Sequence, residues 1–200
     1  DLDIRGAGNL LGDEQSGHVA AVGFELYCQM IDEAVAEAGG EDAEREEAPE
    51  PVRLDVPVDA YLPATFVPFE AAKIDIHRRI VAARETGQLR AIADELSDRF
   101  GPLPPQAENL LKLQRARIEL GLAGARSVEF RGGKLSVTGV ELDSEQAGVL
   151  AEQVEGALYE WREQTAALRV AGDPEERLAA VLAMASGLRA ARRSAEGATA

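Results

Sequence analysis

The sequence predicts an α+β fold, in which a helical hairpin is joined by an acidic linker to a compact domain of about five helices and a small antiparallel sheet. Hydrophobic residues recur at three- and four-residue steps over much of the chain, as they do in amphipathic helices. Three short stretches instead alternate apolar and polar residues, as strands do. Residues 41–51 hold six acids and two prolines with almost no large apolar side chain, which predicts the linker. An alternative for this segment is that its acids compete for a basic surface on a partner.

The first 40 residues open with an unusual density of glycine, since Gly6, Gly8 and Gly12 surround Arg5. Glycine contributes no packing but permits backbone shapes that other residues avoid, so we interpret this stretch as a loop that presents polar groups. Apolar residues then recur with helical spacing over 27–38, before two glycines where a helix would end. With a possible helical turn in the loop, this helix would form the hairpin.

The second domain is expected over residues 52–190, followed by a flexible tail over 191–200. Its predicted elements are, in chain order, an edge strand over 52–60, helices over 69–83, 89–100 and 104–121, strands over 128–131 and 134–137, a helix over 143–161, a strand over 167–170 and a helix over 173–188. Pro57 interrupts the first strand, which favours an edge position. Gly132 and Gly133 form a two-residue turn suited to a tight hairpin, and Asp143 with Gln146 forms a capping box.

Several kinds of chemistry are disfavoured by composition. The net charge is −15, and the first 40 residues offer Arg5 as their one base, so this chain alone should not hold DNA tightly. No Gly-x-x-x-x-Gly-Lys-Ser/Thr run is present to bind a triphosphate, and His18, His77 and Cys28 are too few and too dispersed for a metal site. We therefore expect no catalytic residues, no metal and no cofactor in this fragment. No apolar run is long enough for a membrane span, so we expect a cytoplasmic chain with no membrane partner.

The opening stretch resembles a known motif. Residues 1–12, followed by Gln15-Ser16-Gly17, are similar to the translocation motif that follows the second motor lobe in RecG and in the bacterial transcription-repair coupling factors (Mfd). Later landmarks are similar to the C-terminal TRCF domain of the coupling factors, which RecG does not share. These landmarks are Ala60-Tyr61-Leu62-Pro63, Arg78-Arg79-Ile80, Asp98-Arg99-Phe100-Gly101-Pro102-Leu103-Pro104 and Glu108-Asn109-Leu110-Leu111. The coupling-factor family is therefore the better match, although Lys73 and His77 stand where we expect arginine and tyrosine, and Pro68-Phe69 replaces the usual polar helix start.

The resemblance implies a role within a longer parent protein, an ATP-dependent DNA translocase of transcription-coupled nucleotide excision repair. It implies ATP and Mg²⁺ in the parent motor, with duplex DNA, RNA polymerase and UvrA as the parent's partners. Residues 1–40 would pack on the second motor lobe and couple its motion to translocation. The residues expected to carry this coupling are Arg5, Gly6, Gly8, Asn9, Gly12, Gln15, Ser16 and Gly17.

The second domain, by the same resemblance, would pack on the parent's own N-terminal UvrA-binding domain and mask its UvrA-binding surface. The residues expected at this regulatory interface are Lys73, His77, Arg78, Arg79 and Arg84. Three alternatives stay open at this point: a segment of a RecG-like fork-remodelling helicase, a non-catalytic helical adaptor, and a terminal domain that only aids stability.

Overall fold

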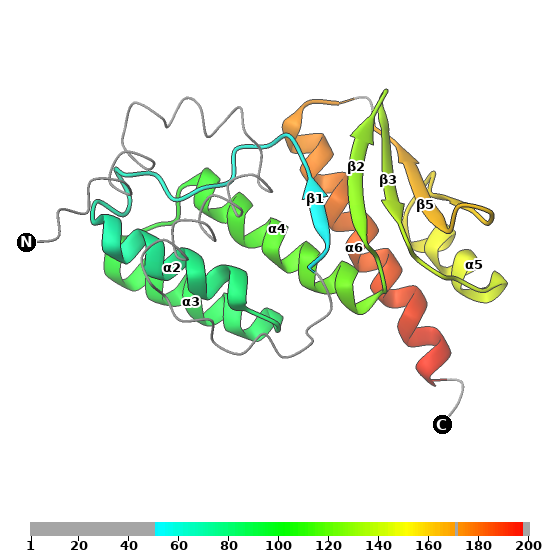
Figure 1. The fold of residues 1–200 in the computed structure, drawn as a ribbon, viewed down its shortest axis with the longest axis horizontal. Helices are drawn as coiled ribbons and strands as arrows, with labels where there is room; N and C mark the ends of the chain where they lie inside the picture. The colour runs from blue at the N-terminus through cyan, green and yellow to red at the C-terminus, as the bar shows by residue number, and fades with distance from the viewer. Residues whose placement is uncertain (1–50, 171, 198–200) are drawn as a thin grey trace, which may run out of the picture. The chain divides into compact units, whose positions relative to one another are not determined.

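The computed structural model describes residues 51–170 and 172–197 (Figure 1). The predicted translocation motif over residues 1–40 lies outside the described residues, as does the acidic linker apart from Pro51. The helices are α2 (Glu70–Ala82), α3 (Thr86–Phe100), α4 (Pro105–Leu122), α5 (Ser144–Gln153) and α6 (Pro174–Gly197). The strands are β1 (Arg53–Asp55), β2 (Ser127–Arg131), β3 (Lys134–Thr138), β4 (Leu158–Glu160) and β5 (Thr165–Arg169). Within these ranges no helix is both long enough and apolar enough to span a bilayer.

These elements divide into two compact units, where the sequence predicted one domain. The first unit contains residues 59–114, and the second contains residues 51–58 together with the described residues from 115 onward. Helix α4 begins in the first unit and ends in the second. The division was not visible in the sequence, because the apolar pattern of α4 continues across it without a break.

In the first unit, α2 and α3 pack against each other, as the apolar pattern predicted. Leu89, Ile92 and Leu96 of α3 are buried, one helical turn apart, and they form its core-facing stripe. The side chain of Glu85 caps the start of α3 in a capping box with Gln88. The sequence analysis correctly expected two helices here, with α3 starting three residues earlier than predicted.

The second unit is built on a five-stranded sheet with the order β1-β2-β3-β5-β4. Three of its strand pairs are antiparallel, but β1 runs parallel to β2, with Leu54 opposite Val128. The predicted antiparallel sheet is therefore corrected to a mixed one. Three helices separate β1 from β2 in the chain, so no tight turn forces them to be antiparallel. The edge position predicted for β1 is confirmed.

The hairpin of β2 and β3 is confirmed, with Gly132 and Gly133 at its turn. Their φ angles are +58° and +73°, which is the left-handed region that a two-residue turn of this kind needs and that side chains disfavour. The alternation also sets the two faces of the sheet. Leu135 and Val137 are fully buried on one face, while Ser136 between them points to the other.

The helix predicted over 143–161 is corrected to a shorter helix followed by a strand. Asp143 caps α5 as expected, but α5 ends at Gln153 and residues 158–160 form β4. Gly156 has a φ of +80° and marks the turn between them. Leu158 and Trp161 continue the helical spacing by coincidence, and they are 68% and 55% exposed.

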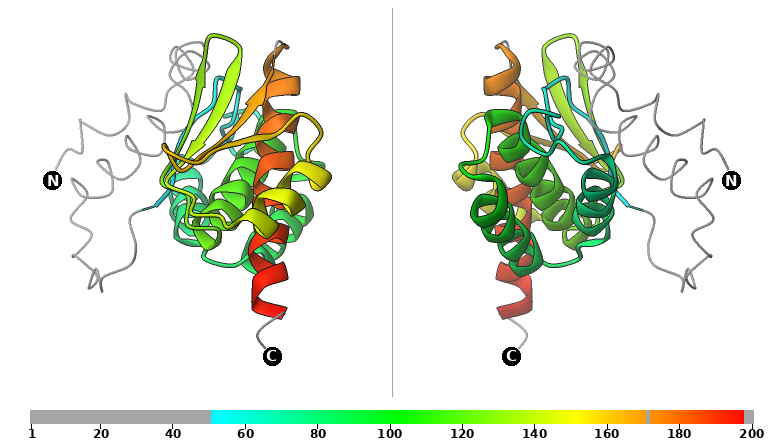
Figure 2. Two further views of the ribbon diagram at one scale, coloured as in Figure 1. Left: turned by 90° about the vertical axis from the view of Figure 1, so that its right-hand side faces the viewer. Right: turned by 90° about the vertical axis from the view of Figure 1, so that its left-hand side faces the viewer.

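Helices α5 and α6 pack together and lie on one face of the sheet (Figure 2). Gly187 permits their close approach, because a Cβ at this position would lie 2.5 Å from Cγ2 of Val154. Helix α6 continues to Gly197 and buries Ala191 completely, so residues 191–197 are helical where a tail was predicted.

Candidate functional site

Helix α2 carries all but one of the residues expected at the regulatory interface, and it presents two different faces. Its buried face consists of Lys73, Ile76, His77 and Ile80. Arg78 and Arg79 point to the exposed side, and Arg84 lies in the exposed turn that follows the helix. The structure therefore divides the five expected residues into two buried and three exposed side chains.

Lys73 and His77 are one helical turn apart and are only 3% and 1% exposed. Burial, and to a smaller extent the positive charge of Lys73, lower the pKa of His77 to about 3. The ammonium of Lys73 lies 3.9 Å from a carboxylate oxygen of Glu70. His77 is consequently neutral at ordinary pH, and neither side chain is presented to another molecule. These two residues belong to the interior of the unit and not to its surface.

Arg79 joins α2 to α3 through a two-pronged ion pair with Glu95. Nη1 of Arg79 donates to Oε1 of Glu95 over 3.0 Å, and Nη2 donates to Oε2 over 2.5 Å. Nη1 of Arg99 also donates to Oε1 over 2.7 Å. Hydrogen bonds from Arg79 and then Arg99 lower the pKa of Glu95 to about 2, and the bond with Glu95 raises the pKa of Arg79. We call these three residues the Glu95 node.

Aromatic rings pack next to the Glu95 node. The guanidinium of Arg99 lies 5.0 Å from the centre of the Phe100 ring. That ring meets Phe66 edge to face, with centroids 5.8 Å apart. The i,i+4 spacing of Glu95 and Arg99 was a signal that the sequence analysis did not use, whereas the pairing with Arg79 depends on tertiary packing.

Arg78 and Arg84 complete the exposed set. In the described ranges, no hydrogen bond or ion pair of either guanidinium is found, although the backbone N–H of Arg84 donates to the side chain of Gln88 over 2.8 Å. They are therefore two cations available to a partner, beside a third, Arg79, that is already engaged. The eight residues expected to couple translocation, from Arg5 to Gly17, lie outside the described residues.

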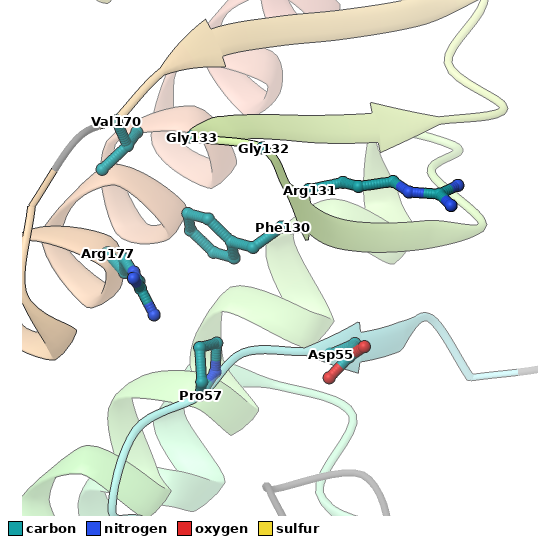
Figure 3. Close-up of a pocket in the computed structure, with 8 residues that line it drawn as sticks. All are labelled: Asp55, Pro57, Phe130, Arg131, Gly132, Gly133, Val170 and Arg177. Atoms are coloured by element: carbon teal, nitrogen blue, oxygen red, sulfur yellow. The ribbon is translucent and has the colours of Figure 1, made fainter.

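A small pocket in the second unit was not expected from the sequence (Figure 3). It has a volume of about 190 Å³ and lies where β1, the β2–β3 turn and the start of α6 meet. The ring of Phe130 lies on the side of the pocket that holds Val170 and Arg177, and the side chain of Arg131 points away from the pocket (Figure 3). Its lining includes no histidine, cysteine, serine or threonine, so it offers no thiol or hydroxyl nucleophile and no histidine base. Nowhere in the described ranges do three or more His, Cys, Asp or Glu residues gather as a metal site would require.

Residues 56–148 match the family model described as the TRCF domain. The match includes the whole of the first unit and the β2–β3 hairpin of the second. The fold and this match together define a TRCF-domain protein.

Named relatives agree with the family model. A transcription-repair-coupling factor of Mycobacterium bovis is 44% identical over 126 residues, which cover 59% of this chain and 10% of the relative. One from Staphylococcus haemolyticus is 43% identical over 138 residues, which cover 69% of this chain and 12% of the relative. The chain thus belongs to the transcription-repair coupling factor family, and it spans about a tenth of the length of these relatives.

A solved structure supports the fold. It is the crystal structure of the C-terminal domain of a transcription-repair coupling factor, which superposes with a TM-score of 0.64. The alignment covers 72% of this chain and 95% of the solved one at 21% identity. The predicted correspondence to a C-terminal fragment is confirmed, since both the family model and the solved domain match this part of the family.

Proposed function

We propose that this chain is the C-terminal regulatory part of an ATP-dependent DNA translocase that acts in transcription-coupled nucleotide excision repair in the cytoplasm. In this proposal the first unit packs on the parent's own N-terminal domain and masks the surface that recruits UvrA. The observation that carries the proposal is the exposed side of α2 and its following turn. There, Arg78 and Arg84 have no acceptor in the described ranges, beside the ordered Glu95 node.

The physical argument begins with the strength that a mask needs. An intramolecular partner is present at an effective concentration in the millimolar range, so weak contacts suffice to keep it bound. Exposed ion pairs are individually worth about 1 kcal/mol or less, and salt screens them. A surface of exposed arginines would therefore bind reversibly, as a mask that must be released requires.

The Glu95 node would give this surface a fixed geometry. Because Arg79 is held by both carboxylate oxygens of Glu95, α2 and α3 are joined at a defined distance and angle. Arg78 is adjacent to Arg79 in the helix and is therefore held with it. The earlier interface set of five residues is accordingly reduced to the exposed Arg78 and Arg84, with Arg79 holding the helices and Lys73 and His77 as interior residues.

The test compares the intact parent with a truncation that ends before residue 52. We expect truncation to raise both the affinity for UvrA and the unstimulated ATPase rate. In the intact parent, the double variant Arg78→Glu and Arg84→Glu should reproduce part of both increases. The matched control is Arg162→Glu, an exposed arginine in the other unit. If truncation changes neither quantity, the masking proposal is wrong.

We also propose that residues 1–40 pass the motion of the second motor lobe to duplex DNA, while ATP and Mg²⁺ bind in the parent motor and RNA polymerase binds elsewhere on it. This proposal rests on the sequence motif. Arg5 would make a forked contact that lysine cannot reproduce. We expect Arg5→Ala in the parent to preserve most ATP hydrolysis and to reduce translocation, with Arg5→Lys equally defective. Equal loss of both activities, or of neither, would contradict this role.

The competing function is that of a RecG-like fork-remodelling helicase. The TRCF-domain match over residues 56–148 and the names of the relatives favour the coupling factors. A helical adaptor without a motor is disfavoured by the same observations, because the matched relatives are about ten times as long as the matched segment.

A further inference from the structure

Strand β4 is an edge of the sheet and carries exposed apolar side chains. It is the last strand in the order β1-β2-β3-β5-β4, so in the described chain it pairs with β5 alone. Leu158 is 68% exposed, and Trp161, directly after the strand, is 55% exposed. Edge strands are usually protected by charged residues or by proline, because their free backbone groups can pair with another chain. The two large apolar side chains make this edge a candidate binding surface.

A hollow of about 400 Å³ lies beside the strand. Leu158 and Ala167, which are directly opposite each other in the sheet, form part of its lining. Trp161 follows the strand directly, and its ring meets Tyr159 edge to face at 4.8 Å, while the Tyr159 hydroxyl donates to the carbonyl of Val140 over 2.6 Å. The edge therefore combines open backbone groups with a preformed space for an apolar side chain.

Two bases, Lys134 and Arg169, and two acids, Glu155 and Glu160, line the hollow, and Arg169 is the base that offers a partner's carboxylate an ion pair. Arg131, Lys134 and Arg169 occupy directly opposite positions on β2, β3 and β5. Like charges at such positions repel each other. Lys134 is neutralised by Glu160 over 2.6 Å, but Arg131 and Arg169 have no ion pair among the described residues. Arg169 lines the hollow, where a carboxylate from a partner would relieve the repulsion.

Two other occupants fit these observations poorly. A nucleic acid carries a phosphate at every nucleotide, and proteins bind its single-stranded bases by stacking aromatic side chains on them. The hollow has no aromatic lining on which a base could stack. A second copy of this chain would need an interface of more than about 1,000 Å², which a three-residue strand does not supply.

We propose that the β4 edge binds an extended segment of a partner protein, which adds a strand beside β4, places an apolar side chain in the hollow and pairs a carboxylate with Arg169. Backbone hydrogen bonds would supply affinity, and the hollow with Arg169 would supply specificity. This surface belongs to the second unit and is separate from the exposed arginines of α2, so it does not depend on the masking proposal.

Trp161 provides the assay, since it is the only tryptophan of the chain. The 200-residue chain is titrated with the capped peptide acetyl-Val-Asp-Leu-Asp-Val-amide while Trp161 emission is recorded. We expect a saturable shift to shorter wavelength, and no shift with the same peptide carrying lysine in place of aspartate. Arg169→Glu should lower the affinity for the acidic peptide about fivefold, which corresponds to the loss of one exposed ion pair. The same substitution should allow the lysine peptide to bind. The matched control is Arg90→Glu, which replaces an exposed arginine of the other unit and should leave the affinity for both peptides unchanged.

Three results would overturn the proposal. The first is the absence of a saturable change at about 1 mM acidic peptide, where even a weak specific complex would form. The second is equal binding by a peptide whose backbone nitrogens are methylated, because strand addition requires those donors. The third is a shift caused by a duplex oligonucleotide, or by protein concentration alone with a matching change in sedimentation, since these would assign the edge to nucleic acid or to a second copy.

Discussion

Replacing His77 with glutamine should remove a pH dependence of stability that the wild-type chain shows. Burial lowers the pKa of His77 to about 3 in the folded chain, whereas an exposed histidine titrates near 6.5. Between these two values the unfolded chain binds a proton that the folded chain does not. The contribution of neutral His77 to the folding free energy is therefore fully present above pH 6.5, and it decreases as the pH is lowered towards 3.

The size of the effect follows from the two pKa values. Lowering the pH from 8 to 5 should cost the folded state about 2 kcal/mol through this one group. Because pH 5 is still well above 3, the result depends almost entirely on the ordinary pKa of the unfolded state. The carboxyl of Glu95 does not interfere, since its pKa of about 2 and its ordinary value of 4.5 both lie below this window.

The assay is urea denaturation followed by circular dichroism at pH 8 and at pH 5. The wild-type chain should lose about 2 kcal/mol more than His77→Gln between the two pH values. The same difference of about 2 kcal/mol should remain when both chains also carry His18→Gln, which removes the other histidine of the chain. If His77→Gln and the wild type lose equal stability, His77 is not buried and neutral as described, and the reasoning is refuted.

Three further substitutions test the packing. Gly187→Ala should lower the midpoint of thermal unfolding, because its Cβ would lie 2.5 Å from Val154 and the strain should cost about 1–3 kcal/mol; a neutral effect would mean that α5 and α6 can move apart. Asp143→Ala should cost about 1 kcal/mol in chemical denaturation, since it removes the bond that Gln146 N–H donates over 2.8 Å, while Asp143→Asn should recover most of it. Glu95→Gln should leave stability near pH 2 unchanged and lower it modestly above pH 4.5, where the ionised carboxylate is paired, as acid titration would show.

The sequence was reliable where short-range chemistry decides the structure. The Gly132-Gly133 turn, the Asp143 cap and the amphipathic stripe of α3 are each set by residues within a few positions of one another. The TRCF family match was also foreseen, because the landmarks that carry it are contiguous stretches of sequence. One error falls where apolar spacing was ambiguous: at β4, Leu158 and Trp161 continued the pattern of the preceding helix.

The candidate site was predicted less well than the fold. Four of the expected residues lie within seven positions of one helix: Lys73, His77, Arg78 and Arg79. Their identities alone do not show which face of the helix is buried. Burial of Lys73 and His77 follows from the elements that pack on α2, and the engagement of Arg79 follows from Glu95, sixteen residues away. Composition indicates charge, but only packing shows which charges are free.

The sequence by itself determined the family, the positions of most helices and the two strands of the central hairpin, since periodicity, caps and turns are local properties. Tertiary structure alone decided the parallel direction of β1, the separation into two units and the sorting of α2's charges into interior and surface. These features depend on contacts between residues far apart in the chain. The free energy of such contacts comes from burial and pairing, which no local pattern specifies.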